Sequence, residues 1–310
     1  MRIVIAGATG LIGKMLTKDL LESKHSVVVL TRSLHRATTF SHPLLQIVHW
    51  DGRTAESWHR HIDGADAVVN LAGESLGTGR WTKSRKKVLI SSRVDPTVAI
   101  VNAIKAATRK PKVLMNASAV GYYGAVDQGD VAEDSPAGND FVSRICLAWE
   151  QSALEAEAAG VRVVFSRSGI VLDPGGGALQ KMLTPFRFFV GGPLGSGNQW
   201  LPWIHREDEV RAIRLLLETE SLSGPVNLTA PESATMQEFG VTLGRVLRRP
   251  STMRVPAFIL KAILGEMADI VLTGQRAVPR KLLQGGFKFK FPVLKEALEE
   301  LLVGKSDAGR

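Results

Sequence analysis

The feature that most constrains this chain is a glycine pattern near its N-terminus. The apolar run Ile3–Ala6 leads into Gly7-Ala-Thr-Gly10-Leu-Ile-Gly13, after which apolar residues recur at helical spacing. Glycines between a first strand and a first helix permit a tight turn, let a pyrophosphate approach the backbone and let helix and strand pack closely. The helix N-terminus then faces the anion. The pattern predicts a dinucleotide-phosphate site formed by Gly7, Thr9, Gly10, Leu11, Ile12 and Gly13.

Short apolar runs alternate with helical patterns through the first 170 residues. The runs lack polar alternation, as expected of strands that are buried on both faces. We predict strands at Ile3–Ala6, Val27–Thr31, Leu45–His49, Ala67–Asn70, Val113–Ala117 and Val161–Ser166, and helices at 11–23, 97–107 and 141–159. This order predicts an α/β fold with a Rossmann-type, doubly wound parallel sheet.

The composition changes after residue 172. Residues 173–203 are rich in Gly, Pro and aromatic side chains, and we expect a mobile loop over a cleft there. Helices are predicted near 207–219, 235–247, 257–272 and 293–302, with a strand at Val226–Thr229. We therefore divide the chain into a dinucleotide-binding core, 1–172, and a smaller substrate-side region, 173–310, that completes the cleft and includes a C-terminal extension at about 255–303.

Composition excludes several classes of protein. Of 310 residues, 45% are hydrophobic and 22% charged, which is ordinary for a globular chain. No run of 18 apolar residues is present, so we expect no membrane association, and the N-terminus has the pattern of a strand and not of a signal peptide. The single cysteine, Cys146, suits a reducing compartment, and we predict a cytoplasmic protein. The seven histidines are scattered, so no metal site is expected.

The net charge of +9 is concentrated in two stretches. Residues 80–93 and 276–295 each hold six basic residues and no acid. Either stretch could be a solvated face or could attract a phosphorylated ligand. Neither carries zinc-finger spacing or an RNA-binding aromatic motif, so we expect no nucleic-acid partner.

Several further segments occur in the order seen in one superfamily. They are Asn70-Leu-Ala-Gly73, Ser118 with Tyr123-Gly124, Arg167 with Pro174, and Trp203-Ile-His205 with Asp208. Together with the glycine pattern, the chain resembles the extended branch of the short-chain dehydrogenase/reductase superfamily, the NAD(P)-dependent epimerases and dehydratases. The tail, from GEMADIVLTGQRAVP to GGFKFKFPVLKEAL, resembles the C-terminal extension of the little-characterised "epimerase family proteins", sometimes labelled cell-division-inhibitor-like.

The end of the second predicted strand indicates which cofactor is bound. It reads Leu30-Thr31-Arg32-Ser33, with no acid between Glu22 and Asp51. A carboxylate there would repel the 2′-phosphate of NADP, whereas a guanidinium binds it bidentately. We predict NADP(H) at Thr31 and Arg32; a solvated surface arginine is the alternative.

The resemblance implies further cofactor contacts. It places Asp51 near the adenine, and Leu71, Ala72 and Gly73 along the adenosine ribose. It also brings Arg93 close to the cofactor, although a structural salt bridge explains this arginine equally well.

The catalytic pattern of the superfamily is incomplete here. The resemblance implies a serine with a YxxxK pair, in which the lysine lowers the pKa of the tyrosine. Ser118 fits the serine, but Val142 and Cys146 occupy the tyrosine and lysine positions. Three hypotheses remain. Tyr123 or Tyr122 supplies a hydroxyl, water or substrate supplies the proton, or the protein only senses NADP(H).

The substrate side also departs from the family pattern. Leu201 replaces the arginine that holds a sugar-nucleotide diphosphate, and Ile170 replaces a polar asparagine. Trp200, Leu201 and Trp203 would make an apolar wall for a hydrophobic ligand, unless the two tryptophans pack in the core. We predict an NADP(H)-dependent oxidoreductase acting on a small carbonyl or alcohol. The alternatives are a non-catalytic, NADP(H)-responsive regulator that meets a protein partner through its C-terminal extension and, third, a nucleotide-sugar epimerase.

Overall fold

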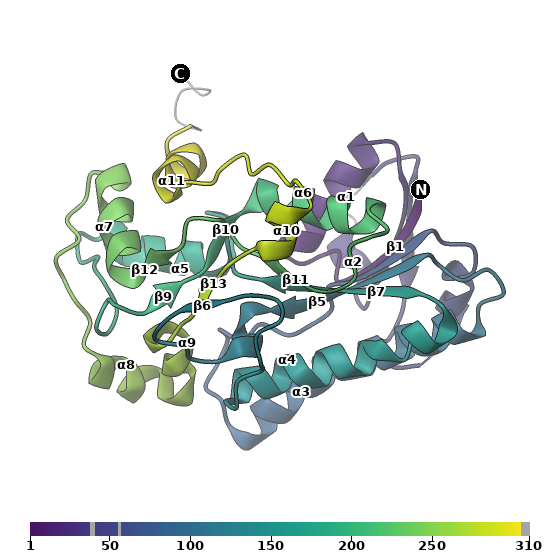
Figure 1. The fold of residues 1–310 in the computed structure, drawn as a ribbon, viewed down its shortest axis with the longest axis horizontal. Helices are drawn as coiled ribbons and strands as arrows, with labels where there is room; N and C mark the ends of the chain where they lie inside the picture. Colours follow the sequence, from purple (N-terminus) through teal and green to yellow (C-terminus); the bar gives the residue numbers. More distant parts are fainter. Residues whose placement is uncertain (38–40, 55–56, 305–310) are drawn as a thin grey trace.

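The computed structural model describes residues 1–37, 41–54 and 57–304. Its centre is a seven-stranded sheet in the order β11-β7-β5-β4-β1-β2-β3, with every neighbouring pair parallel (Figure 1). The strands are β1 (Arg2–Ala6), β2 (Ser26–Thr31), β3 (Leu45–His49), β4 (Ala67–Asn70), β5 (Val113–Ala119), β7 (Arg162–Ser168) and β11 (Gly224–Leu228). The strand order reverses between β1 and β4, where a doubly wound sheet opens a crevice at its carboxyl edge.

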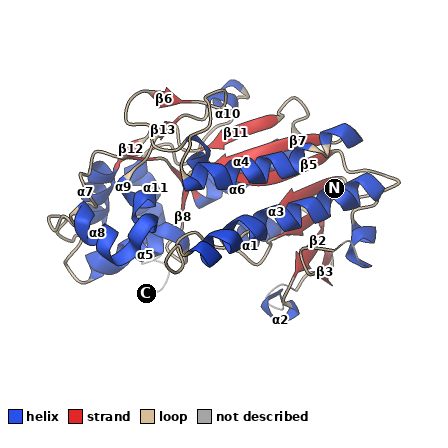
Figure 2. Ribbon diagram, turned by 90° about the horizontal axis from the view of Figure 1, so that it is seen from below, coloured by secondary structure: helices blue, strands red, loops and turns tan. Residues whose placement is uncertain are grey.

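Helices cover both faces of this sheet. Helices α1 (Leu11–Glu22) and α6 (Arg206–Glu218) lie on one face, and α3 (Lys83–Ala106) and α4 (Phe141–Leu154) on the other (Figures 1 and 2). Successive side chains of a strand point to opposite faces. Ile3 and Ile5 therefore pack in the core under α1 and α6, while Val4 packs under α3 and α4. The predicted doubly wound fold is confirmed.

The regions on either side of residue 172 are joined through the central sheet. Strand β11 pairs with β7, placing Val226 opposite Ser166, and α6 packs against α1. The rest of the second region forms its own apolar core from α5 (Gly177–Arg187), α7 (Met236–Leu247) and α11 (Leu294–Leu302). This region therefore shares the central sheet. Residues 305–310 of it lie outside the described part.

Shorter elements complete the chain. The strands are β6 (Asp130–Val131), β8 (Ile170–Leu172), β9 (Trp200–Leu201), β10 (Trp203–His205), β12 (Ala234–Thr235) and β13 (Arg276–Ala277). The helices are α2 (Leu34–Ala37), α8 (Ala257–Leu264), α9 (Asp269–Leu272) and α10 (Arg280–Gln284), with 3-10 turns at Ser57–His61, Val120–Tyr123, Glu157–Ala159 and Gly265–Ala268. In the segments that the structure describes, no helix combines the length and apolar character needed to cross a membrane.

Three predicted elements differ from those observed. The stretch 173–203, expected to be a mobile loop, contains α5. The helix predicted from residue 97 begins at Lys83, because Thr82 caps it by accepting the Arg85 N–H and because the chain tolerates Pro96 inside the helix. The helix predicted over 257–272 is broken at Gly265, whose φ of 61° interrupts helical geometry.

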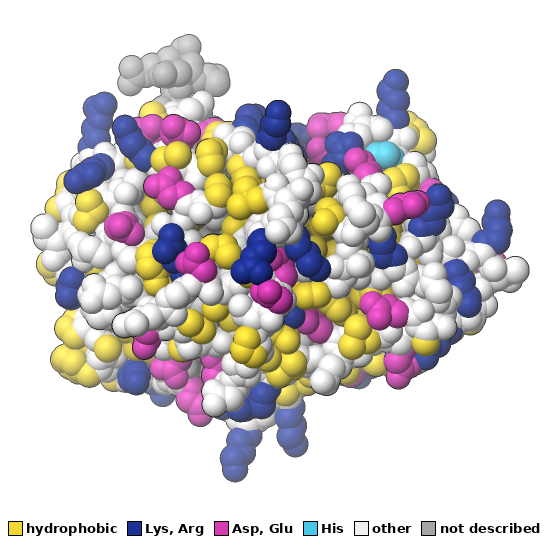
Figure 3. All heavy atoms as spheres, in the orientation of Figure 1, with side chains coloured by type: hydrophobic (Ala, Val, Ile, Leu, Met, Phe, Trp, Pro, Cys, Tyr) yellow, Lys and Arg dark blue, Asp and Glu magenta, His cyan; other side chains and the backbone are white. Residues whose placement is uncertain are grey.

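The two basic stretches bind mainly within the protein. In the first, which forms the N-terminal half of α3, Arg80 donates to the Ala262 and Ile263 carbonyls and Lys86 pairs with Glu266. In the second, Arg276, Arg280 and Lys290 pair with Asp130, Asp134 and Glu207. The face shown in Figure 3 accordingly mixes basic and acidic side chains. Several of these basic groups therefore have protein partners, although Arg276, Arg280 and Lys290 remain about half exposed.

Candidate cofactor and substrate site

The glycine loop joins β1 to α1 at the carboxyl edge of the sheet. Gly7 has a φ of 82°, and a Cβ there would lie 2.6 Å from the Leu71 carbonyl carbon. A Cβ on Gly13 would lie 2.3 Å from the Gly7 oxygen. Gly10 is less crowded, since its Cβ would meet only the Gly7 oxygen, at 3.3 Å. Two of the glycines are thus required by packing, whereas Gly10 borders open space.

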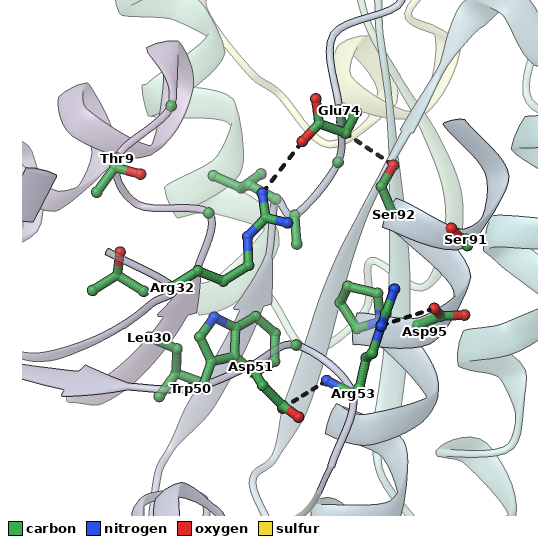
Figure 4. Close-up of a pocket in the computed structure, with 18 of the residues that line it drawn as sticks. Thr9, Leu30, Arg32, Trp50, Asp51, Arg53, Glu74, Ser91, Ser92 and Asp95 are labelled. Carbon is green, nitrogen blue, oxygen red and sulfur yellow. Dashed lines mark hydrogen bonds and ion pairs between the residues drawn. The ribbon is translucent and has the colours of Figure 1, made fainter. Parts of the chain in front are cut away.

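A polar pocket of about 380 Å³ opens beside this loop (Figure 4). Nine of the predicted cofactor residues line it: Gly7, Thr9, Gly10, Thr31, Arg32, Asp51, Leu71, Ala72 and Gly73. Leu11, Ile12 and Gly13 form the adjoining first turn of α1, which has no side-chain cap at Gly10. The backbone N–H groups of this turn can therefore bind an anion.

Arg32 extends into this pocket from the end of β2. Its side chain is 68% exposed, and its Nη2 lies 3.3 Å from Glu74 Oε1. Glu74 is shared with Arg85, at 3.7 Å. Because Glu74 would keep Arg85 as a partner, Arg32 can turn toward a ligand phosphate without leaving a carboxylate alone. Arg32 is both exposed and on the pocket wall.

Asp51 lines the pocket but its carboxylate is engaged locally. It accepts the backbone N–H groups of Thr54 and Arg53, at 2.9 and 2.8 Å, and the Thr54 hydroxyl. These hydrogen bonds lower the pKa of Asp51. The residue therefore shapes the turn that carries the pocket wall.

Arg93 is buried and does not line the polar pocket. It is 8% exposed, stacks on Trp149 and donates to the carbonyls of Leu89 and Glu74, both at 2.9 Å. Its guanidinium thus anchors the loop that carries Glu74 without lining the pocket. The prediction that Arg93 contacts the cofactor is not supported by this placement, and its partners are carbonyls, not a salt-bridging acid.

Other pocket residues were not predicted. Trp50, Arg53, Glu74, Ser92 and Asp95 also line the wall, and Arg53 Nε lies 3.5 Å from Asp95 (Figure 4). Arg53 and Asp95 come from two separate segments, and no local motif marks them. The position of Trp50 directly before Asp51 is the one signal that could have identified it.

A second, largely apolar pocket of about 490 Å³ lies over the carboxyl ends of β5 and β7. Trp200, Leu201 and Ile170 line it, as the predicted apolar wall requires. Val142, at the family's tyrosine position, lines it too. Trp203 does not, because it is 1% exposed and packs in the core of α5 and α7. For Trp203 the packing alternative holds and the predicted substrate contact is wrong.

The C-terminal tail supplies one wall of the apolar pocket. Seven of its residues lie there: Glu266, Asp269, Ile270, Val271, Thr273, Gly274 and Gln275. Gln275 Nε2 donates to the Val120 carbonyl at 2.6 Å, and Gln199 Nε2 donates to the Val271 carbonyl at 2.7 Å. The first bond attaches the tail to the Rossmann core, and the second attaches it to the residue directly before β9.

Ser118 and Tyr123 belong to a buried polar network, not to either pocket wall. Ser118 Oγ donates to Glu150 Oε1 at 2.6 Å, and Arg167 makes two 2.9 Å bonds to the same carboxylate. The Tyr123 hydroxyl donates to Asn227 Oδ1 at 2.7 Å and accepts from Arg167 at 3.1 Å. The Tyr122 ring stacks on Arg167, with 3.4 Å between ring centroid and guanidinium carbon. The structure therefore gathers all three around Arg167.

This placement does not support the predicted catalytic roles of Ser118, Tyr123 and Tyr122. Ser118 and Tyr123 are 5% and 3% exposed, and burial raises the pKa of Tyr123 even though Arg167 opposes the shift. At the family's lysine position, burial raises the pKa of Cys146 to about 12, so its thiol stays protonated. The network instead fixes the strand ends that carry the apolar pocket.

Comparison with known proteins fits this geometry. Residues 3–228 match the NAD dependent epimerase/dehydratase family, and residues 255–301 match a domain of unknown function, DUF1731. An epimerase family protein of Staphylococcus saprophyticus is 42% identical over 302 residues, which cover 96% of this chain and 98% of that protein.

Solved structures are similar as well. The human epimerase family protein SDR39U1 (isoform 2), crystallised with NADPH, is 36% identical with a TM-score of 0.87, over 97% of this chain and 99% of that one. UDP-glucuronic acid 4-epimerase from Bacillus cereus, in complex with NAD, has a TM-score of 0.75 at 16% identity, over 96% and 94% of the two chains. At that identity it shares the fold alone. Sequence and fold agree that the chain belongs to the NAD dependent epimerase/dehydratase family, as one of its epimerase family proteins with a DUF1731 tail.

Proposed function

We propose that this protein binds NADP(H) across the carboxyl edge of its sheet and reduces a small apolar carbonyl compound, or oxidises the corresponding alcohol. The observation that carries the proposal is the polar pocket, in which Gly10 borders open space and the exposed Arg32 lies at the end of β2. A phosphate beside Arg32 would gain a charge-assisted, bidentate partner. The NADPH in the similar human structure supports the same choice of cofactor.

The residues present fit such a cofactor. The uncapped first turn of α1 would hold the pyrophosphate, Arg32 the 2′-phosphate, and Leu71, Ala72 and Gly73 would border the adenosine half. The other half would extend across the strand reversal toward β5 and β7, where the apolar pocket lies. When bound, the cofactor supplies the hydride. The protein orients the carbonyl and excludes water with Val142, Leu201 and Ile170.

The pocket wall favours a hydrophobic substrate over a sugar nucleotide. Leu201 and Ile170 present no charge or hydrogen bond to a diphosphate, and Trp200 offers an aromatic face. These residues argue against the nucleotide-sugar epimerase alternative. The free, buried thiol of Cys146 suits a reducing compartment, and we propose a cytoplasmic location.

A non-catalytic, NADP(H)-responsive regulator is the second candidate. Val142 and Cys146, at the positions of the superfamily's tyrosine and lysine, favour it. In that case, the tail that borders the apolar pocket would present a cofactor-dependent surface to a protein partner.

One experiment distinguishes the two candidates. Purified protein is mixed with NADPH and with carbonyl probes that fit an apolar pocket, such as benzaldehyde and acetophenone, and the loss of NADPH absorbance is followed. The oxidoreductase predicts turnover that saturates with the probe. Tight NADPH binding without turnover of any probe would support the regulator.

A further inference from the structure

Ser168 and Glu209 connect the apolar pocket to a buried acid. Ser168, the last residue of β7, is partly exposed on the pocket wall. Glu209, in the first turn of α6, is 0% exposed. Ser168 Oγ lies 2.6 Å from Glu209 Oε1 in a hydrogen bond. Within the described residues, Glu209 Oε2 has no hydrogen-bond partner.

Ser168 is the pocket hydroxyl that remains available. Thr273, the other lining hydroxyl, donates to the Asp269 carbonyl at 2.7 Å. Most lining nitrogen donors have partners of their own. Lys86 pairs with Glu266, Arg144 donates to the Asn139 carbonyl, Trp81 to the Leu76 carbonyl, Gln275 to the Val120 carbonyl, and Gln199 to the Leu194 and Val271 carbonyls. The indole N–H of Trp200 also lines the pocket, but an indole donates a hydrogen bond and does not give up its proton. Ser168 alone in this lining set is bonded to a buried carboxyl group.

The charged groups around Glu209 are engaged elsewhere. Helix α6 packs on α1, β5, β7, β8 and β10, and the described parts of β5 and β8 contain no charged residue. On the other elements, Arg167 pairs with Glu150, His205 with Glu300 and Lys18 with Glu22, while Arg162 donates to the Leu216, Leu217 and Leu222 carbonyls. On α6 itself, Arg206 pairs with Asp173, Glu207 with Lys290, Asp208 with Arg211, and Arg214 with Asp19 and Glu218. Lys14 is exposed to solvent.

Glu209 is therefore an acid that keeps its proton. Burial raises its pKa to about 8, and the hydrogen bond from Ser168 only partly opposes this shift. Once protonated, the carboxyl O–H donates in the bond to Ser168 Oγ. The proton of Ser168 itself is then free to point into the pocket.

We propose that Ser168 and Glu209 form the proton-donating pair of the reduction, with Ser168 contacting the substrate oxygen and Glu209 resupplying its proton. This assignment rests on the proposed function. The pair would supply the proton that the superfamily's tyrosine and lysine supply in other members. Its two residues come from β7 and α6, whereas the superfamily's pair would lie on α4.

The atoms and electrons of the step balance. The carbonyl carbon accepts the hydride with its electron pair, so NADPH is oxidised to NADP⁺ and the C=O π pair moves to oxygen. That oxygen takes the Ser168 proton, and Ser168 Oγ takes the proton of Glu209. The products are the alcohol and a Glu209 carboxylate, which regains a proton from solvent through Ser168 when the product leaves.

The first test needs no turnover. Carboxyl ¹³C NMR of the full-length protein, with the Glu209 signal assigned by its absence in Glu209→Gln, should show a titration midpoint near 8. Between pH 4.5 and about 8 the unfolded chain releases this proton while the folded one keeps it, so wild-type stability falls as pH rises. Glu209→Gln has no such proton to release, so its stability should not fall for this reason. The difference in Tm between Glu209→Gln and wild type should therefore shift in favour of the variant as pH rises through this range. A midpoint near 4.5 would overturn the proposal.

The second test uses kinetics with NADPH and acetophenone. Glu209→Gln and Ser168→Ala should each lower kcat about 100-fold with little change in KM. The wild-type kcat should fall as pH rises through about 8, and Glu209→Gln should lose this dependence. The matched control is Ser166→Ala, which removes a buried hydroxyl from the same strand and face but not from the pocket wall, and it should retain the wild-type rate.

The outcomes separate the two claims. Full kcat and an unchanged pH profile in Ser168→Ala would remove the proton-donating role and leave the oxidoreductase intact. No NADPH-dependent turnover of any probe in the wild type would remove the oxidoreductase, and this role with it.

Discussion

The polar and apolar pockets lie at the same edge of the same sheet but are built differently. The polar pocket is lined by residues between Gly7 and Pro96, most of them in the short loops that follow β1 to β4. The apolar pocket combines segments as distant in sequence as Leu76 and Gln275, including the tail. The first pocket depends on local loop geometry. The second depends on long-range packing around the Arg167 network, so substitutions should affect the two in different ways.

The largest expected effect is on the polar pocket. Gly10→Val places a branched side chain over the loop, where the protein leaves room but a pyrophosphate needs to approach. We expect NADPH binding to be abolished, as measured by fluorescence titration. The circular dichroism spectrum should stay that of wild type and Tm should fall only slightly, because a Cβ at Gly10 meets only the Gly7 oxygen, in a tight contact at 3.3 Å. Normal NADPH affinity in this variant would show that the loop does not hold the cofactor.

The apolar side should instead respond through stability. Glu150→Gln leaves the buried guanidinium of Arg167 without its carboxylate, and breaking such a pair costs about 3–5 kcal/mol. Urea unfolding measures this loss. The control is Glu155→Gln, which removes an exposed partner of Lys105 near the end of the same helix and should leave the midpoint almost unchanged. Equal midpoints for both variants would contradict the importance of the network.

Arg32→Ala tests which group in the polar pocket selects the cofactor. Losing one charge-assisted phosphate contact costs roughly 1.5–3 kcal/mol, which is about tenfold or more in affinity. NADPH should weaken by that factor while NADH barely changes, as measured by calorimetry. Arg53→Ala, which removes the other arginine of the pocket wall, should alter the NADPH-to-NADH ratio less. The reverse ranking would assign the 2′-phosphate to Arg53.

The smallest effects concern the three hydroxyls that were candidates for catalysis, those of Ser118, Tyr123 and Tyr122. Tyr123→Phe leaves Asn227 and Arg167 each short of one hydrogen bond, and Ser118→Ala removes a bond to Glu150. Each should cost about 1–3 kcal/mol in unfolding free energy. Tyr122→Phe keeps its ring on Arg167 and should cost less. A loss of about 100- to 1,000-fold in the rate of carbonyl reduction, with stability intact, would instead restore their catalytic role.

The sequence predicts site residues best where their position depends only on the strand that precedes them. Gly7 and Arg32 come directly after buried strands, Gly10 lies in the short loop after β1, and the carboxyl ends of parallel strands meet at one edge of the sheet. Ser118 lies near the end of β5 and Tyr123 in the turn that follows it, but side-chain direction decides their role, and it depends on Glu150, Arg167 and Asn227 from distant segments. Glu209 could not be identified from sequence, because only the packing of α6 on β7 reveals that it is buried.

The apolar wall was predicted only in part for a related reason. Trp200 and Trp203 lie three residues apart in one Trp- and Pro-rich segment, yet one lines the pocket and the other fills the core. The intervening Leu201 and Pro202 line the pocket as well. Short strands such as β9 and β10 give too few residues for alternation to identify the exposed face.

The central claim is that the polar pocket is built for NADP(H). Calorimetric titration of the wild-type protein with NADPH and NADH under identical conditions tests it most directly. We expect NADPH to bind at least about tenfold more tightly, since the charge-assisted contact at Arg32 is worth more than 1.4 kcal/mol. Equal affinities, or tighter binding of NADH, would contradict the account.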